Sequence, residues 1–159
     1  KNQTSSGAGG GGHVVRGNVA TVNGTGFSIA GTGHTVSGNV ASGNLGTGFF
    51  LSGTGLVLTG NAAVGNALAG AEVSAQSAAV TITKSVFIGN HRRGDAFRCG
   101  IWNFSPFAID ARESFWGAPT GPGASPADQE CNDSIVGSVL VAPFASKPIK
   151  VKTKSPTID

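Results

Sequence analysis

Charge is scarce in this 159-residue sequence, which has 12% charged residues against about 25% in a typical soluble domain, and no methionine or tyrosine. Low charge combined with 39% apolar residues argues against a disordered polar chain. No apolar run approaches the roughly 18 residues of a membrane span. The net charge is +3, and no basic face with interleaved aromatics is evident. We therefore expect neither nucleic-acid binding nor a membrane span.

Cysteine is also sparse. The two cysteines, Cys99 and Cys131, lack the C-x-x-C spacing of redox and metal sites. An even count in a chain rich in Gly, Ser and Thr predicts one disulfide, and with it a secreted, periplasmic or cell-surface location. The alternative is two unrelated thiols. Position 1 is not methionine, so we expect a processed product or part of a longer chain.

Glycine, by contrast, accounts for 26 of the 159 residues, more than double its usual share of about 7%. The glycines belong to a repeat seen in residues 13–33, 34–55 and 56–79, with a looser copy from Val80. Asparagine recurs at two positions of this repeat. The first set is Asn2, Asn23, Asn44, Asn66 and Asn90, and the second is Asn18, Asn39 and Asn61. The register predicts that residues 1–12 are the second half of an earlier coil, and the alternative is a flexible Gly-rich leader.

The repeat length excludes paired-helix repeats, which need about 33 residues or more. Each copy instead contains short alternations of apolar and polar residues, which are typical of strands. The pairs expected to point inward are Phe27 and Ile29, Phe49 and Leu51, Ala71 and Val73, and Phe97 and Cys99; Val36, Leu58 and Ile82 are expected inward on a second strand. One coil cannot bury its own apolar face, but coils stacked at about 4.8 Å can. The pattern predicts an all-β solenoid of about five coils, with the recurring asparagines stacked in columns.

Two segments carry a family resemblance. Residues 38–55, GNVASGNLGTGFFLSGTG, resemble the right-handed parallel β-helix repeat of the pectin-lyase-like superfamily, and residues 114–123, SFWGAPTGPG, resemble the W-G-x-x-x-G-P segment that often closes such helices in secreted bacterial proteins. The resemblance covers roughly residues 13–145 and implies a right-handed parallel β-helix. It implies no particular chemistry, because the superfamily includes lyases, hydrolases, adhesins and inert scaffolds.

The domain organisation follows from where the repeat stops. We expect coils over 1–113, an irregular C-terminal cap over 114–145, and a solvated basic tail over 146–159 that contains Lys147, Lys150, Lys152 and Lys154. The aromatic residues expected beneath the cap are Trp102, Phe104, Phe107, Phe115 and Trp116. A Cys99–Cys131 bridge would tie the cap to the last regular coil. The N-terminal coil has no evident cap, so self-association through it is expected.

Candidate chemistry is limited, because Glu72 is the only acid before residue 91. The weak catalytic candidates are Arg92, Arg93, Asp95, Asp110 and Glu113, which could serve a polysaccharide lyase or a glycoside hydrolase. The favoured interpretation is a solvated loop of mutually paired charges, with Arg98 opposite Glu72 of the preceding coil. His13 and His34 should stack at about 5 Å, but they lack a third metal ligand.

The leading hypothesis is a non-catalytic extracellular β-helix scaffold that binds glycans and stacks end to end, with no cofactor. The alternative is a fragment of a carbohydrate-active enzyme. A minor alternative is an ice-binding solenoid, because Thr25 stacks on Thr47 and Thr32 on Thr54 in the predicted register. These rows are only two deep, and we expect no T-x-T face.

Overall fold

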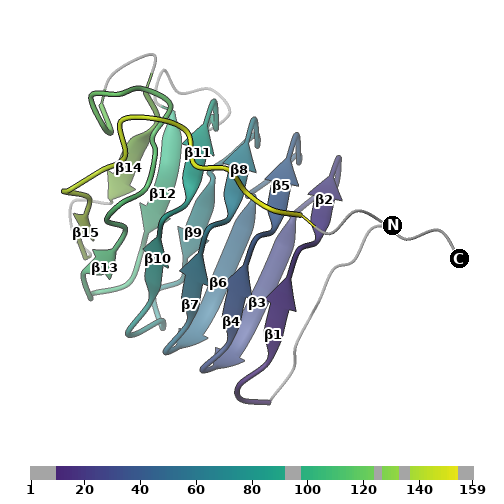
Figure 1. Cartoon of the computed structure of the whole chain (residues 1–159). Helices are drawn as coiled ribbons and strands as arrows, with labels where there is room; N and C mark the ends of the chain where they lie inside the picture. The colour runs from purple at the N-terminus through teal and green to yellow at the C-terminus, as the bar shows by residue number, and fades with distance from the viewer. Residues whose placement is uncertain (1–9, 92–97, 124–126, 133–136, 154–159) are drawn as a thin grey trace, which may run out of the picture.

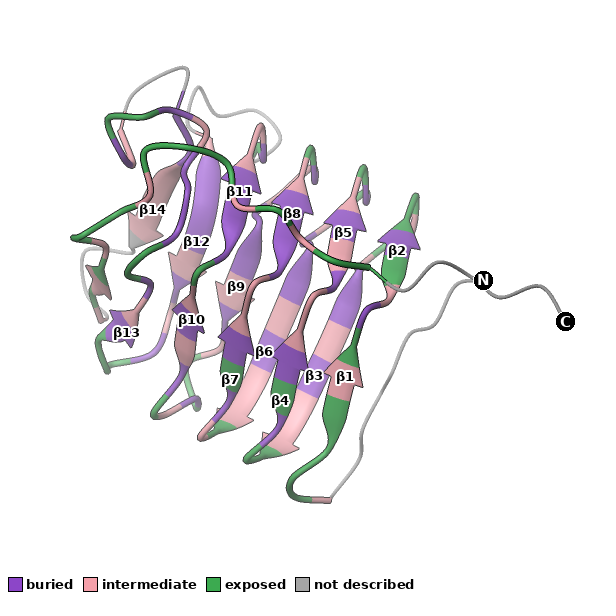
Figure 2. Cartoon of the chain, viewed as in Figure 1, coloured by how far each residue is buried: buried purple, intermediate pink, exposed green. Residues whose placement is uncertain are grey.

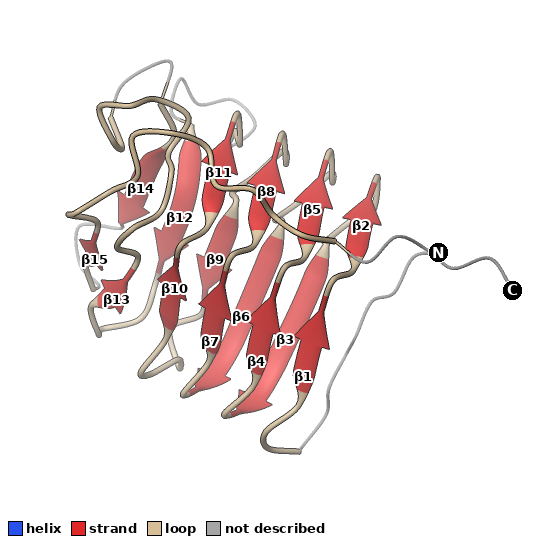
Figure 3. Cartoon of the chain, viewed as in Figure 1, coloured by secondary structure: helices blue, strands red, loops and turns tan. Residues whose placement is uncertain are grey.

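The computed structural model describes residues 10–91, 98–123, 127–132 and 137–153. Every regular element in this part of the chain is a β-strand (Figure 3). The strands form three sheets, and every neighbouring pair is parallel (Figure 1). The all-β solenoid expected from the repeat is confirmed.

Each sheet is named here by its first strand. The β1 sheet contains β1 (Val14–Arg16), β4 (Thr35–Ser37), β7 (Val57–Thr59), β10 (Thr81–Thr83), β13 (Ile109–Asp110) and β15 (Val139–Leu140). The β2 sheet contains β2 (Val19–Thr21), β5 (Val40–Ser42), β8 (Ala62–Val64) and β11 (Val86–Ile88). The β3 sheet contains β3 (Phe27–Thr32), β6 (Phe49–Thr54), β9 (Ala71–Val73), β12 (Cys99–Asn103) and β14 (Gln129–Asn132).

The regular coils are fewer than the five expected. Three coils, β1–β3, β4–β6 and β7–β9, repeat one strand from each sheet at near-constant length. The fourth, β10–β12, is lengthened between β11 and β12. After it, no further strand of the β2 sheet follows within the described residues, although Phe115 forms an isolated bridge to Val86.

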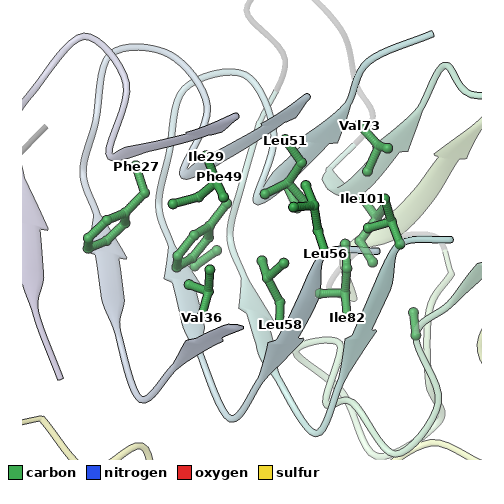
Figure 4. Close-up of a cluster of buried hydrophobic side chains, with 14 of the residues drawn as sticks. Phe27, Ile29, Val36, Phe49, Leu51, Leu56, Leu58, Val73, Ile82 and Ile101 are labelled. Carbon is green, nitrogen blue, oxygen red and sulfur yellow. The ribbon is translucent and has the colours of Figure 1, made fainter. Parts of the chain in front are cut away.

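Buried positions on all three sheets form the interior (Figure 2), and Figure 4 shows large apolar side chains that fill it. Phe27 and Phe49 stack with ring centroids 5.0 Å apart, and the β2 sheet faces them with the small residues Ala20 and Ala41. In the fourth coil the aromatic residue, Phe87, comes from the β2 sheet instead. Large side chains on one sheet therefore occupy the room left by alanines on another, as close packing requires.

The expected register of the fourth coil is wrong. Ala71 pairs with Ile101 and Glu72 with Trp102, so Ile101 and Asn103 take the inward positions that we assigned to Phe97 and Cys99. Arg98 is consequently not opposite Glu72, and Phe97 lies outside the described residues. The extra length between β11 and β12 moves the next strand further along the chain, and local alternation cannot reveal such an insertion.

The C-terminal end of the solenoid is closed by Trp116. Its fully buried ring stacks on Phe87 with centroids 5.0 Å apart, and a Cβ on Gly100 would lie 2.7 Å from it. Phe115 is also buried, but Trp102 and Phe104 are only half-buried and Phe107 is 54% exposed. The expectation that all five aromatics lie beneath the cap is therefore wrong for Phe107, and Trp102 takes the outward position of its strand.

A second departure concerns the segment that we name the strap, residues 144–153. It runs back along the outer face of the β2 sheet towards the first coils (Figure 1, yellow). Ala145, Ile149 and Val151 pack against a cluster formed by Val40, Ala62, Val64, Val86, Ile88 and Phe115. The described part of the expected basic tail is therefore docked, because Ile149 and Val151 alternate with the exposed residues Lys150 and Lys152.

Two asparagine columns hold successive coils in register. Asn66 shows the full pattern, because its Oδ1 accepts from the backbone N (3.2 Å) and Nδ2 (2.7 Å) of Asn44. Its Nδ2 donates to Asn90 Oδ1 at 2.8 Å and to the carbonyl of Ala41 at 3.1 Å. Each amide thus satisfies both its own polar atoms and backbone groups at bends between strands.

The columns extend beyond asparagine. In the first, Asn23 N donates to Asn44 Oδ1 at 3.0 Å, and Asn2 lies outside the described residues. In the second, Asn18 and Asn39 donate to the next asparagine, and Asn61 N then donates to Ser85 Oγ at 3.3 Å. Ser85 N in turn donates to Ser114 Oγ. Neither serine is apparent from the repeat, because both interrupt the asparagine pattern.

The columns predict unequal costs for the same substitution. Asn66→Ala removes side-chain bonds to partners in the coils on both sides, Asn44, Ala41 and Asn90, and should lower the free energy of unfolding by about 3–5 kcal/mol. Asn18→Ala, in the first coil, removes only bonds from Nδ2 to Arg16 O and Asn39 Oδ1 and should cost about 1 kcal/mol. Urea denaturation followed by circular dichroism measures both, and equal losses would contradict the role of the columns.

Candidate functional site

The charged cluster expected from the sequence is only partly visible, because Arg92, Arg93 and Asp95 lie outside the described residues. Asp110 accepts two hydrogen bonds from the Arg112 side chain, from Nε at 2.9 Å and from Nη2 at 2.8 Å, and a third from the Arg112 backbone N at 3.1 Å. The Arg112 hydrogen bond lowers the pKa of Asp110, which keeps this carboxylate ionised and unsuited to donate a proton. Glu113 pairs with a different cation, Lys84, at 3.5 Å. Both described acids of the cluster are therefore paired with neighbouring cations.

The histidine pair stacks with ring centroids 5.2 Å apart. Both nitrogens of His34 have partners: Nδ1 accepts from the backbone N of His13 at 3.1 Å, and Nε2 donates to the carbonyl of Ala30 at 2.9 Å. Metal ligation by His34 would break one of these bonds. Within the described residues, no three His, Cys, Asp or Glu side chains gather around a common point. The arrangement supports a structural role for His34 at a corner of the coil.

The disulfide expected from the sequence is present. Cys99 and Cys131 are joined with their Cα atoms 5.5 Å apart, which links β12 to β14. The bond spans 32 residues, and a loop of this length contributes about 3–4 kcal/mol in the chain-entropy model. It ties the last strand of the β3 sheet to its neighbour.

The most distinctive surface is a row on the outer face of the β3 sheet, which we name the aromatic strip: Phe50, Glu72, Trp102 and Phe104. The register places Phe50, Glu72 and Trp102 side by side on successive strands. The rings of Trp102 and Phe104 lie 4.4 Å apart with a 41° tilt, and both side chains are half-buried. Thr47 Oγ1 donates to Glu72 Oε2 at 3.0 Å, which orients the carboxylate.

The strip was not expected from the sequence, in which Trp102 and Phe104 are predicted to lie beneath the cap. Alternation along β6 does assign Phe50 outward, since Phe49 and Leu51 are buried on either side of it. The sequence around Trp102 does not show whether its side chain faces inward or outward, because that depends on the extra residues between β11 and β12. The strip therefore joins residues whose alignment follows from coil stacking.

The threonine rows also differ from expectation. Thr32 pairs with Thr54, but longer rows lie on the outer face of the β1 sheet, where Thr35, Val57 and Thr81 align beside Ser37, Thr59 and Thr83. A T-x-T motif is therefore present at Thr81–Thr83. Arg16 aligns with Ser37 and Asp110 with Thr81, so charged residues bound both rows.

A buried carboxylate ends the first asparagine column. Asp128 is fully buried and accepts hydrogen bonds from Gly89 N at 2.8 Å, Asn90 N at 3.1 Å and Asn90 Nδ2 at 2.7 Å. Burial raises the pKa of Asp128 despite these bonds, because desolvation penalises the charged form. Asp128 lies 38 residues beyond Asn90, so repeat spacing could not identify it.

Comparison with family models assigns the fold independently. The model of the right handed beta helix region matches residues 3–110, more than half of the chain. The chain belongs to the right-handed β-helix family. Membership agrees with the pectin-lyase-like resemblance of the repeat, and the matched residues include Phe50, Glu72, Trp102 and Phe104. Searches of curated proteins and of solved structures gave no match. Among the described residues, no helix is long and apolar enough to cross a membrane.

The raised pKa of Asp128 predicts a pH dependence that the variant Asp128→Asn should lack. Because the folded-state pKa lies above the unfolded one, the stability contributed by Asp128 is complete below the unfolded pKa and is lost as pH rises through the folded pKa. Asn at this position can still accept from Asn90 N and Nδ2, as Asn90 does from Asn66. The difference between the urea midpoint of Asp128→Asn and that of the wild type should therefore be more favourable to the variant at pH 7 than at pH 4.

Asp128→Ala provides the matched control. It removes every acceptor and should cost about 3 kcal/mol or more, because it leaves three donors unpaired, two of them buried. If the free energies of unfolding of the wild type and Asp128→Asn change with pH in the same way between pH 4 and pH 7, Asp128 is not the source of the pH dependence.

Proposed function

We propose that this chain is a rigid, non-catalytic β-helix scaffold of an extracellular or surface protein, and that it binds glycans through the aromatic strip. The observation that carries the proposal is the alignment of Phe50, Glu72 and Trp102 on three adjacent strands. A neutral polysaccharide presents apolar C–H faces and many hydroxyl groups. The strip offers a complementary surface of rings and a hydrogen-bond acceptor.

The spacing of the strip suits an extended ligand. Phe50 and Trp102 are two strands apart, which corresponds to about 10 Å along the solenoid. Their rings can stack on sugar faces, and Glu72, held by Thr47, can accept hydrogen bonds from hydroxyl groups. Strands hold side chains more precisely than loops do, so the surface is preorganised for binding.

A carbohydrate-active enzyme is the alternative. It has less support, because Asp110 and Glu113 are paired with Arg112 and Lys84. Hydrolysis needs one carboxylic acid that can donate a proton, whereas the lowered pKa of Asp110 favours its ionised form. The Cys99–Cys131 disulfide supports an oxidising location, either secreted, periplasmic or at the cell surface.

A glycan array followed by calorimetry tests the strip. Phe50→Ser, which installs the residue found one coil earlier at Ser28, should weaken glycan binding by about tenfold or more, because it removes a stacking surface. Phe107→Ser is the matched control, since it removes an exposed ring outside the strip. The proposal fails if the intact chain binds no glycan or if both variants bind equally. Shortened polysaccharide products would instead favour the enzyme.

A second proposal concerns self-association through the first coil. Asn44 Nδ2 donates to Ala20 O, and Asn66 Nδ2 donates to Ala41 O, both in the preceding coil. Asn23 Nδ2 is buried and lacks any such partner. Val22, the residue before Asn23, is 75% exposed. Among the described strands, β1, β2 and β3 lie at the ends of their sheets, and with the exposed Val22 they form a surface that a second copy would cover.

Sedimentation velocity over a range of concentrations tests this association. Val22 adopts a positive φ of 57° where later coils have Gly43, Gly65 and Gly89, so Val22→Gly should relieve strain and keep the fold. Loss of association in this variant would support the proposal, whereas a strictly monomeric wild-type protein would refute it.

A further inference from the structure

A pocket lies where the strap leaves the cap and reaches the coils. Its volume is ≈ 360 Å³, within the range of roughly 300–1,000 Å³ that is usual for small-ligand sites. The residues that line it are Lys84, Glu113, Pro143, Phe144, Ala145 and Ile149. We name it the strap pocket.

The backbone beneath the strap pocket is unusual for this solenoid. A left-handed turn follows the first five strands of the β1 sheet, and after β1, β4 and β7 it is supplied by Gly17, Gly38 and Gly60 with φ of 69°, 62° and 62°. The next two turns place Lys84 and Glu113 there, with φ of 51° and 58°. Residues other than glycine rarely adopt this backbone conformation, so Lys84 and Glu113 occupy positions where glycine would be less strained. Such outliers concentrate at functional sites.

The two charges indicate what kind of ligand the pocket would take. Lys84 Nζ and Glu113 Oε2 are 3.5 Å apart, and their side chains are 59% and 58% exposed. An anion would be repelled by Glu113 and a cation by Lys84, so the pair favours a neutral molecule. Adjacent hydroxyl groups could accept a hydrogen bond from the ammonium and donate one to the carboxylate.

The other walls are apolar and include an accessible ring. Phe144 is 38% exposed, and its ring packs against Gly121, where a Cβ would lie 2.6 Å from Cε1. Any residue larger than glycine at position 121 would therefore displace the ring. A fixed aromatic ring beside paired hydrogen-bonding groups complements the apolar face and the hydroxyl edge of a pyranose.

We propose that the strap pocket binds a single neutral sugar ring, with Phe144 stacking on its face and with Lys84 and Glu113 hydrogen-bonded to adjacent hydroxyl groups. The strap pocket has the same ligand class as the aromatic strip, but it shares no residue with the strip and lies outside the β3 sheet. Sugar binding at the strap pocket and glycan binding at the aromatic strip can therefore be tested and refuted separately.

Titrations monitored by ¹H–¹⁵N correlation spectra, with glucose, galactose and N-acetylglucosamine as probes, test this site. At least one sugar should shift the amide signals of Lys84, Glu113, Phe144 and Ala145 in a saturable way. The double variant Lys84→Gly/Glu113→Gly restores the residue of the preceding coils and should weaken binding by at least about tenfold. Its urea midpoint should stay equal or rise, because glycine relieves the left-handed turns.

Phe50→Ser separates this site from the aromatic strip, because it should leave the strap-pocket shifts unchanged whatever it does to glycan binding. The inference is overturned if no sugar shifts these signals up to 50 mM, roughly the limit of meaningful single-sugar affinity. It is also overturned if the double variant folds and binds as the wild type does. Shifts confined to residues near Phe50 and Trp102 would assign sugar binding to the strip alone.

Discussion

The solenoid depends on one constraint, which is that equivalent bends of successive coils must lie directly above one another. Backbone groups at these bends lie outside the strand ladders and would otherwise be buried without partners. Asn44 and Asn66 meet this requirement because a side-chain amide both donates and accepts, so one residue joins three coils. Ser85 and Asp128 take over as the coils become irregular, which shows that any side chain that supplies the acceptor can continue a column.

Stacking in register has a second consequence, since it forms three outer faces with different properties. The β2 sheet carries an apolar face that the strap covers through Ile149 and Val151. The β1 sheet presents small threonine and valine side chains, and the β3 sheet presents the aromatic strip. Side chains in each row follow one another at the strand spacing of about 4.8 Å. A substitution in one coil therefore changes a single contact position in a row that a long ligand could span.

The charged residues explain why binding is a better proposal than catalysis. Asp110 and Glu113 have cationic partners, and Asp128 is buried within a structural column. The Lys84–Glu113 pair stands apart, because it occupies turns that glycine fits better and faces an accessible pocket. Side chains held by paired strands lose little further entropy on binding, which suits a scaffold that presents preformed surfaces.

The sequence by itself determined the fold class, because the near-constant spacing of glycine and asparagine indicates stacked coils of similar length. It also determined which residues face inward where coils are regular, such as Phe49 and Leu51. Only the tertiary structure decided the alignment of Trp102 with Glu72, the docking of the strap and the burial of Asp128. These features arise where the repeat is broken. At these places the position of each residue depends on packing against residues far away in the chain, and a local sequence repeat contains no information about that packing.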